Sequence, residues 1–196
     1  FNAIHGAGGE DGQIQGFLEP LHRPYTGAGL LAMATTMDKW TTKRIWEAEG
    51  LPVVPYVGVT EEQWGRERQV VLERALTLGL PLFLKPANLG SSIGIEKVKE
   101  ASQLAEAMDR AFSFDRRVLV EQGLDVRELE VAALGGDDPT VSVVGEVKVA
   151  GEFYDFYDKY VNGKSVAVIP AELPQDVAEE IRGYAYHAYR ALDCYG

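Results

Sequence analysis

The chain has 196 residues, of which 46% are hydrophobic and 25% charged, and its net charge is −11. This composition is typical of a globular protein with a sizeable core and one or two domains. The acidic balance argues against nucleic acid or an anionic membrane as partner, because both attract basic surfaces. Cys194 is the only cysteine, so no intrachain disulfide can form, and a reducing compartment fits. No apolar run approaches the ~20 residues of a membrane span.

Both ends of the sequence have features of an internal segment. Phe1 is not an initiator methionine, and residues 1–5 are typical of the second half of a strand. At the other end, Tyr195 and Gly196 leave a helix where a further strand is expected. We therefore expect the sequence to be an internal piece of a longer protein.

Helix and strand signals alternate irregularly in the first half of the chain. Asp38 is a good N-cap for the helix that follows it, and Gly50 and Pro52 close that helix. In chain order we expect a strand at 1–5, a glycine-rich loop at 6–12, a helix at 13–21, a turn-rich domain edge at 24–29, a helix from Asp38 to about Glu49, a strand at 53–59 and a helix at 61–78.

The second half continues this mixed order. Core-spaced apolar residues predict one helix, and Pro174 opens the last one. The mixture fits an α+β fold better than a regular βαβ series. We expect strands at 80–84 and 93–98, a helix at 101–112, strands at 117–121, 128–134 and 140–149, no regular structure at 151–165 and a helix from Pro174.

Residues 82–95 are the most informative segment. An apolar strand ends in Lys85, and Pro86 is expected to stop regular pairing because it has no N–H. The turn Gly90-Ser91-Ser92 has small side chains, so its backbone amides can face outward beside the lysine. This arrangement suits phosphate oxygens. An ordinary hairpin with a surface lysine explains the segment equally well when it is taken alone.

Further short segments follow this pattern in a fixed order along the chain. They are His5-Gly6, Gly9-Glu10-Asp11-Gly12, Gln15-Gly16, Pro24-Tyr25-Thr26-Gly27, Met37-Asp38-Lys39, the segment Leu80 to Pro86, Gly90-Ser91-Ser92-Ile93-Gly94, the segment Val118 to Glu121, Phe153-Tyr154-Asp155 and Lys159-Tyr160.

In this order and spacing the segments resemble the D-alanine–D-alanine ligases of the ATP-grasp superfamily. The resemblance implies an ATP-grasp fold: the tail of an N-terminal α/β substrate domain at 1–28, a central domain at 29–122 and an incomplete C-terminal domain from 123 to 196. It also implies the chemistry: ATP phosphorylates the carboxylate of one D-alanine, and the amine of a second D-alanine then displaces phosphate from the acyl phosphate. Fixed cations and amide dipoles favour both steps.

The resemblance assigns ten residues to ATP. Lys39, Lys85 and Lys159 would contact the phosphates, under a small lid whose Ser92 amide lies nearest to them. Glu121 would accept a hydrogen bond from the adenine amino group, Glu128 would hold the ribose, and Phe153 would lie against the ring. Gln122, Gly123 and Leu124 would line the adenine edge. Relatives often carry an aromatic residue at Gly123, so we expect looser packing there.

Three residues are assigned to the substrate side. Ser91 would face the substrate, the hydroxyl of Tyr160 would bond to it from a loop that closes over the site, and His5 would lie near the first D-alanine. Several of the assigned residues also have an ordinary structural explanation. Lys39 and Glu128 suit a solvent-facing surface, Phe153 a core, the loop serines a turn, and a lone histidine a hydrogen-bonded structural role.

The resemblance also implies Mg²⁺, whose ligands are expected outside this sequence, so no residue here is assigned to metal. The implied enzyme is a cytoplasmic homodimer that acts on D-alanine and ATP in peptidoglycan precursor synthesis, without nucleic acid or membrane partners. Two alternatives remain: a D-alanine–D-lactate ligase, against which Tyr160 argues, and a nucleotide-binding relative that has lost catalysis.

Overall fold

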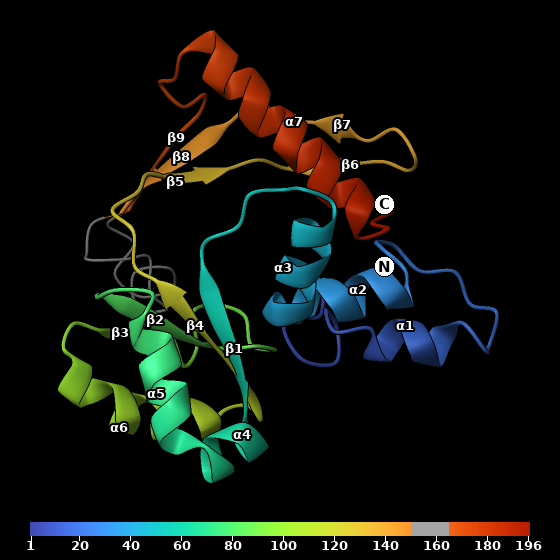
Figure 1. The fold of residues 1–196 in the computed structure, drawn as a ribbon. Coiled ribbons are helices and arrows are strands. Elements are labelled where there is room, and N and C mark those ends of the chain that lie inside the picture. The colour runs from blue at the N-terminus through green and yellow to red at the C-terminus, as the bar shows by residue number, and fades with distance from the viewer. Residues whose placement is uncertain (150–164) are drawn as a thin grey trace.

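A computed structural model describes residues 1–149 and 165–196 (Figure 1). Three short helices, joined by loops and turns, form the N-terminal part. Asp38 precedes the third of them and accepts a hydrogen bond from the Thr41 amide at 2.7 Å, so it is the N-cap that the sequence predicts. These helices are α1 (Gln13–Leu18), α2 (Leu30–Met37) and α3 (Lys39–Ala48).

The centre of the molecule is a four-stranded antiparallel sheet with the order β1-β4-β2-β3. Three helices and a 3₁₀ turn lie between its strands in the sequence. The strands are β1 (Tyr56–Thr60), β2 (Leu82–Pro86), β3 (Glu96–Val98) and β4 (Arg117–Gln122), and the helical elements are α4 (Glu61–Arg66), α5 (Arg68–Leu76), η1 (Ala101–Gln103) and α6 (Leu104–Phe112).

One face of this sheet packs against α4, α5 and α6 to form the core (Figure 1). Because side chains alternate along a strand, the residues between the core positions point to the opposite face. That face carries Phe83, Lys85 and Glu121. The core consists of Val59, Trp64, Val71, Ala75, Leu82, Leu84, Val98, Leu104, Ala107, Met108, Ala111, Val118 and Val120.

Helix α3 contacts this opposite face at Gly58 of β1. A β-carbon at Gly58 would lie 2.1 Å from Cε2 of Trp40, so the indole occupies the space above the glycine. The Arg117 guanidinium packs over the same ring, 4.7 Å from its centroid, and pairs with Asp38. This packing holds α3, with Lys39 and Lys43 on it, against the sheet.

Two smaller sheets and a long helix form the C-terminal part (Figure 1). The indole Nε1 of Trp46 donates to the carbonyl of Ala188 at 3.3 Å and joins α3 to the long helix. The first sheet contains β5 (Glu128–Glu130), β8 (Gly145–Lys148) and β9 (Val166–Val168), the second β6 (Ala133–Leu134) and β7 (Thr140–Val141), and the helix is α7 (Gln175–Ala191).

The α+β class and most predicted elements are confirmed, but several details were wrong. Residues 1–5 form no strand, because they pair with no other strand in the described chain. Helix α2 and strand β9 were not predicted. The helix predicted at 61–78 is two helices, and the strands predicted at 128–134 and 140–149 are each broken in two.

Pro86 corrects a further expectation. It does not stop pairing but forms the last pair of β2, opposite Val118 of β4. The last pair between β2 and β3 is Leu84 with Glu96, so β3 no longer flanks β2 at the proline. The aperiodic stretch at 151–165 lies almost entirely outside the described residues. Within the described residues, no helix is both long and apolar enough to span a membrane.

Candidate functional site

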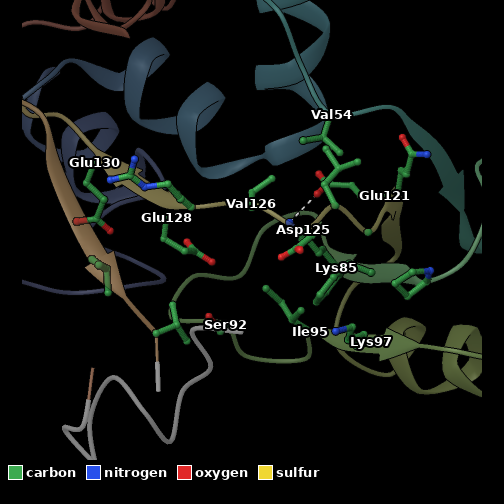
Figure 2. A pocket seen from close by; sticks show the side chains of 18 of the residues that line it. Val54, Lys85, Ser92, Ile95, Lys97, Glu121, Asp125, Val126, Glu128 and Glu130 are labelled. Atoms are coloured by element: carbon green, nitrogen blue, oxygen red, sulfur yellow. Dashed lines mark hydrogen bonds and ion pairs between the residues drawn. The ribbon is translucent and has the colours of Figure 1, made fainter. Parts of the chain in front are cut away.

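A cavity of about 830 Å³ lies between the β5-β8 sheet and the face of the central sheet that carries Phe83, Lys85 and Glu121 (Figure 2). Its size is in the range of small-molecule and cofactor pockets. Its lining comes from β2, β3, β4, the connection after β4, β5 and β8. The lining residues are Val54, Pro81, Phe83, Lys85, Ser92, Ile95, Lys97, Glu121 to Glu128, Glu130 and Glu146 to Val149.

Lysines form one wall of this cavity, and strand register explains why. In the pairing of β2 with β4, Phe83 faces Glu121, and in the pairing with β3 it faces Lys97. Lys85, two residues along β2, is therefore a diagonal neighbour of Glu121 on the same face. The Lys85 Nζ lies 2.5 Å from Oε2 of Glu121.

Glu121 lies between two lysines. Its other carboxylate oxygen, Oε1, is 3.0 Å from Nζ of Lys43, which reaches it from α3. The Glu121 side chain is only 7% exposed. Burial alone would raise the pKa of this carboxyl, but the charges of Lys85 and Lys43 outweigh it and hold the pKa below its ordinary value. Glu121 is therefore a buried, ionised carboxylate at neutral pH.

Carboxylates from the C-terminal part form the opposite wall. Glu128 and Glu130 are two residues apart on β5, so they share the face that lines the cavity, and Asp125 precedes them in the chain (Figure 2). Glu146 of β8 is buried and accepts two hydrogen bonds from Arg127, at 2.8 and 2.7 Å. The hydrogen bond from Arg127 lowers the pKa of the Glu146 carboxyl. The central-sheet side of the cavity thus carries Lys85 and Lys97 beside Glu121, and on the opposite side carboxylates outnumber the two cations, Arg127 and Lys148.

The connection after β4 crosses the end of the cavity. Gln122, Gly123 and Leu124 all line it, and the Leu124 side chain is half exposed there. The Gly123 amide donates to the carbonyl of Pro81 at 2.7 Å, and a β-carbon at Gly123 would lie 2.6 Å from that oxygen. The chain therefore approaches Pro81 too closely at Gly123 for a side chain, and looser packing of the adenine edge there stays a prediction.

The Gly-Ser-Ser turn lies at the edge of the cavity. Ser91 and Ser92 both have left-handed backbone conformations, with φ of 53° and 58°, which are uncommon for non-glycine residues. Ser92 lines the cavity and Ser91 does not. Strained residues of this kind often occur at ligand-binding sites.

Lys39 is half-buried against the segment 86–89, which leads from β2 into this turn. Its ammonium donates to the carbonyls of Pro86 at 3.2 Å, Ala87 at 3.4 Å and Leu89. Burial, together with the nearby charge of Lys85, lowers its pKa. Lys39 does not line the cavity, so the structure presents it as a support for the turn, and contact with phosphate stays a prediction.

The cavity brings together seven of the thirteen residues assigned from the sequence. His5 is not among its lining residues; its side chain is 94% exposed, with Nδ1 3.9 Å from Glu10. Phe153, Lys159 and Tyr160 lie outside the described residues. The seven are Lys85, Ser92, Glu121, Gln122, Gly123, Leu124 and Glu128.

Lys43 is a functional candidate that the sequence reading missed. It follows Lys39 by four residues, so the two cations share one face of α3. Like charges at this spacing repel, and a buried pair of them needs a carboxylate partner. The four-residue spacing of the two lysines is therefore the signal in the sequence that could have identified Lys43.

Metal ligands do not assemble in the described part of the chain. Residues 1–149 and 165–196 contain no group of three or more His, Cys, Asp or Glu side chains placed to hold a metal ion.

Comparison with known proteins identifies the family to which the chain is related. Residues 45–196 match the family model described as D-ala D-ala ligase C-terminus. The chain is 49% identical over 194 residues to the D-alanine--D-alanine ligase of Prosthecochloris aestuarii, covering 98% of this chain and 54% of the relative. It is 45% identical to the Enterococcus faecalis enzyme of the same name, covering 98% of this chain and 56% of that one.

Solved structures give the same result for the fold. D-alanyl-alanine synthetase A from Vibrio cholerae superposes with a TM-score of 0.86 at 35% identity, covering 98% of this chain and 58% of that one. The VanG D-Ala:D-Ser ligase from Enterococcus faecalis gives a TM-score of 0.85 at 32% identity, covering 97% and 55%. The fold is therefore of the ATP-grasp type. The chain spans about half the length of the curated relatives that it matches.

Proposed function

This chain belongs to the D-alanine–D-alanine ligase family, and we propose that it carries the ATP site of an enzyme that joins two D-alanines. The observation that carries the proposal is the cavity with its ionised Glu121 between Lys43 and Lys85 and its opposite wall of carboxylates. The family match over residues 45–196 supports the reaction.

The proposed reaction has two steps, a phosphoryl transfer and an acyl transfer. An oxygen of the first D-alanine carboxylate attacks the γ-phosphorus of ATP, the bond to the bridging oxygen breaks, and ADP leaves. The amine of the second D-alanine then attacks the acyl carbon, the bond to the phosphate oxygen breaks, and the amine loses a proton as inorganic phosphate departs. Phosphorylation is needed because a carboxylate oxygen is otherwise a poor leaving group.

The two walls suggest how ATP lies in the cavity. Phosphates would lie toward Lys85 and the Ser92 turn, since fixed cations stabilise the charge that moves during phosphoryl transfer. The ribose hydroxyls, which are hydrogen-bond donors, would lie toward Glu128. Adenine would then meet the connection from Glu121 to Leu124, where the Glu121 carboxylate accepts a hydrogen bond from the amino group.

Several further assignments belong to this proposal. Phe153, Lys159, Ser91 and Tyr160 would complete the site on its nucleotide and substrate sides, His5 would lie near the first D-alanine, and Lys39 would support the phosphate turn. We also propose a cytoplasmic homodimer working with Mg²⁺ in peptidoglycan precursor synthesis. Light scattering after size-exclusion chromatography tests the homodimer.

The purified full-length protein tests the function directly. It should bind ATP in calorimetry, and with Mg²⁺ and D-alanine it should release one phosphate for each D-alanyl-D-alanine detected by mass spectrometry. ATP binding without phosphate release would instead favour a relative that has lost catalysis. A preference for D-lactate or D-serine as second substrate would move the protein to a different acceptor class, as the name of the VanG neighbour illustrates.

A further inference from the structure

The two lysines on Glu121 differ in their surroundings. Lys43 is 12% exposed, does not line the cavity and is anchored elsewhere, because its Nζ also donates to the Val54 carbonyl at 3.1 Å. Its ammonium lies 5.2 Å from the centroid of the Tyr56 ring. Lys85 is 27% exposed, and it lines the cavity (Figure 2). Lys43 is a fixed counterion, and Lys85 is an accessible one.

The Tyr56 ring favours this fixed position of Lys43. Tyr56 lies directly opposite Glu121 in the pairing of β1 with β4, and its hydroxyl donates to Glu47 at 2.8 Å. Burial, together with that hydrogen bond, raises the pKa of Tyr56 to about 12. The ring therefore stays neutral at physiological pH and offers its face to the ammonium.

Binding of a polyphosphate changes the balance around Glu121. A phosphate in the cavity would draw Lys85 toward it and away from Oε2 of the carboxylate. A buried carboxylate without a partner is strongly unfavourable, so a second cation must stay in place. Lys39 is not available for this role, because it donates to backbone carbonyls of the turn after β2. Among the residues that the structure describes, Lys43 is the cation on Glu121 that remains.

We propose that Lys43 is a positioning residue for nucleotide binding: it holds Glu121 ionised and in place when Lys85 turns to the phosphates. Oε2 is then released to accept a hydrogen bond from the adenine amino group, while Oε1 stays on Lys43. This inference rests on the proposed function, because it requires that the cavity binds ATP. It couples contact of Lys85 with the phosphates to recognition of the base by Glu121.

Calorimetric titration of ATP and GTP into the purified protein and its variants tests the proposal. Lys43→Met should weaken ATP binding by about 10-fold or more, since hydrogen bonds to charged groups are worth ~1.5–3 kcal/mol. GTP binding should change less, because guanine has a carbonyl where adenine has the amino group, so discrimination falls. Lys43→Arg keeps the positive charge and should recover most of the lost ATP affinity. Arg44→Met removes an exposed cation from the same helix and should change neither affinity.

A double-mutant cycle separates positioning from ordinary packing. In a Glu121→Gln background no buried negative charge needs neutralising, so adding Lys43→Met should change ATP affinity by less than about 3-fold. If Lys43→Met alone does not fold but the double variant does, the lysine acts through the charge of Glu121, as proposed.

Three results would overturn the proposal while leaving the proposed function intact. They are an equal loss of ATP and GTP affinity in Lys43→Met, a loss that persists unchanged in the Glu121→Gln background, and failure of both the single and the double variant to fold. Any of these would make Lys43 a packing residue. Absence of ATP binding by the parent protein would instead remove the proposed function itself.

Discussion

Gly58 provides the sharpest test of how the fold positions the site. A β-carbon at this position would lie 2.1, 2.3 and 2.6 Å from Cε2, Cζ2 and Cδ2 of Trp40. Ordinary carbon contacts are ~3.5–4.0 Å, so Gly58→Ala would force the indole, or α3 itself, to move by more than ~1 Å. The Arg117 guanidinium packs on the same ring and resists that movement.

The expected loss of stability follows from this overlap. Insertion of a methyl group into a packed site typically costs ~1–3 kcal/mol, and we expect the upper end because the contact is with a rigid ring. Gly183→Ala is the matched control, because its β-carbon would meet nothing within 4 Å in the interior of α7. The control should stabilise the protein by ~0.5–1 kcal/mol, so the two substitutions should change the free energy of unfolding in opposite directions.

Urea unfolding at neutral pH measures both free energies. Trp40→Leu combined with Gly58→Ala should lose clearly less than the sum of the single variants, because the smaller side chain removes the overlap. Gly58→Ala should also weaken ATP binding several-fold, since α3 carries Lys39 and Lys43. An unchanged unfolding free energy for Gly58→Ala, or a loss that does not depend on Trp40, would refute this account of how α3 is seated.

Three further predictions concern charged residues of the cavity. Lys85→Ala should raise the ATP concentration needed for half-maximal rate and slow phosphate release. Lys85→Arg should restore little of this activity, because the guanidinium is bulkier and planar. Unchanged steady-state kinetics in Lys85→Ala would remove Lys85 from the site. Glu121→Ala should reduce the preference for ATP over GTP by ~1–3 kcal/mol in competition binding, and an unaltered preference would exclude adenine reading by this carboxylate. Arg127→Met should destabilise the protein at neutral pH and progressively less in acid. The reason is that the folded-state pKa of Glu146 is depressed, so its contribution is present above the ordinary value of 4.5 and is lost as pH falls through the folded value. Thermal unfolding across that acid range checks this, and a pH-independent difference would contradict it.

Local signals in the sequence were sufficient for much of the fold. Asp38 as an N-cap, the apolar spacing in 101–112 and Pro174 before the last helix each involve residues within a few positions of one another. The short motifs, which indicated the family, are local in the same sense. Such signals act through neighbouring backbone groups, so they can be read without knowing which segments meet.

The arrangement of the cavity depended on distant segments. Residues 1–5 have a strand-like pattern but pair with no strand among residues 1–149 and 165–196, and a strand without a partner has unpaired backbone groups. Lys85 meets Glu121 only because of the register between β2 and β4, and Lys43 joins them only because Trp40 seats α3 over Gly58. Composition and periodicity place each side chain on a face of its own element. Only the packing of the elements decides which faces meet, and therefore which carboxylate is neutralised by which lysine.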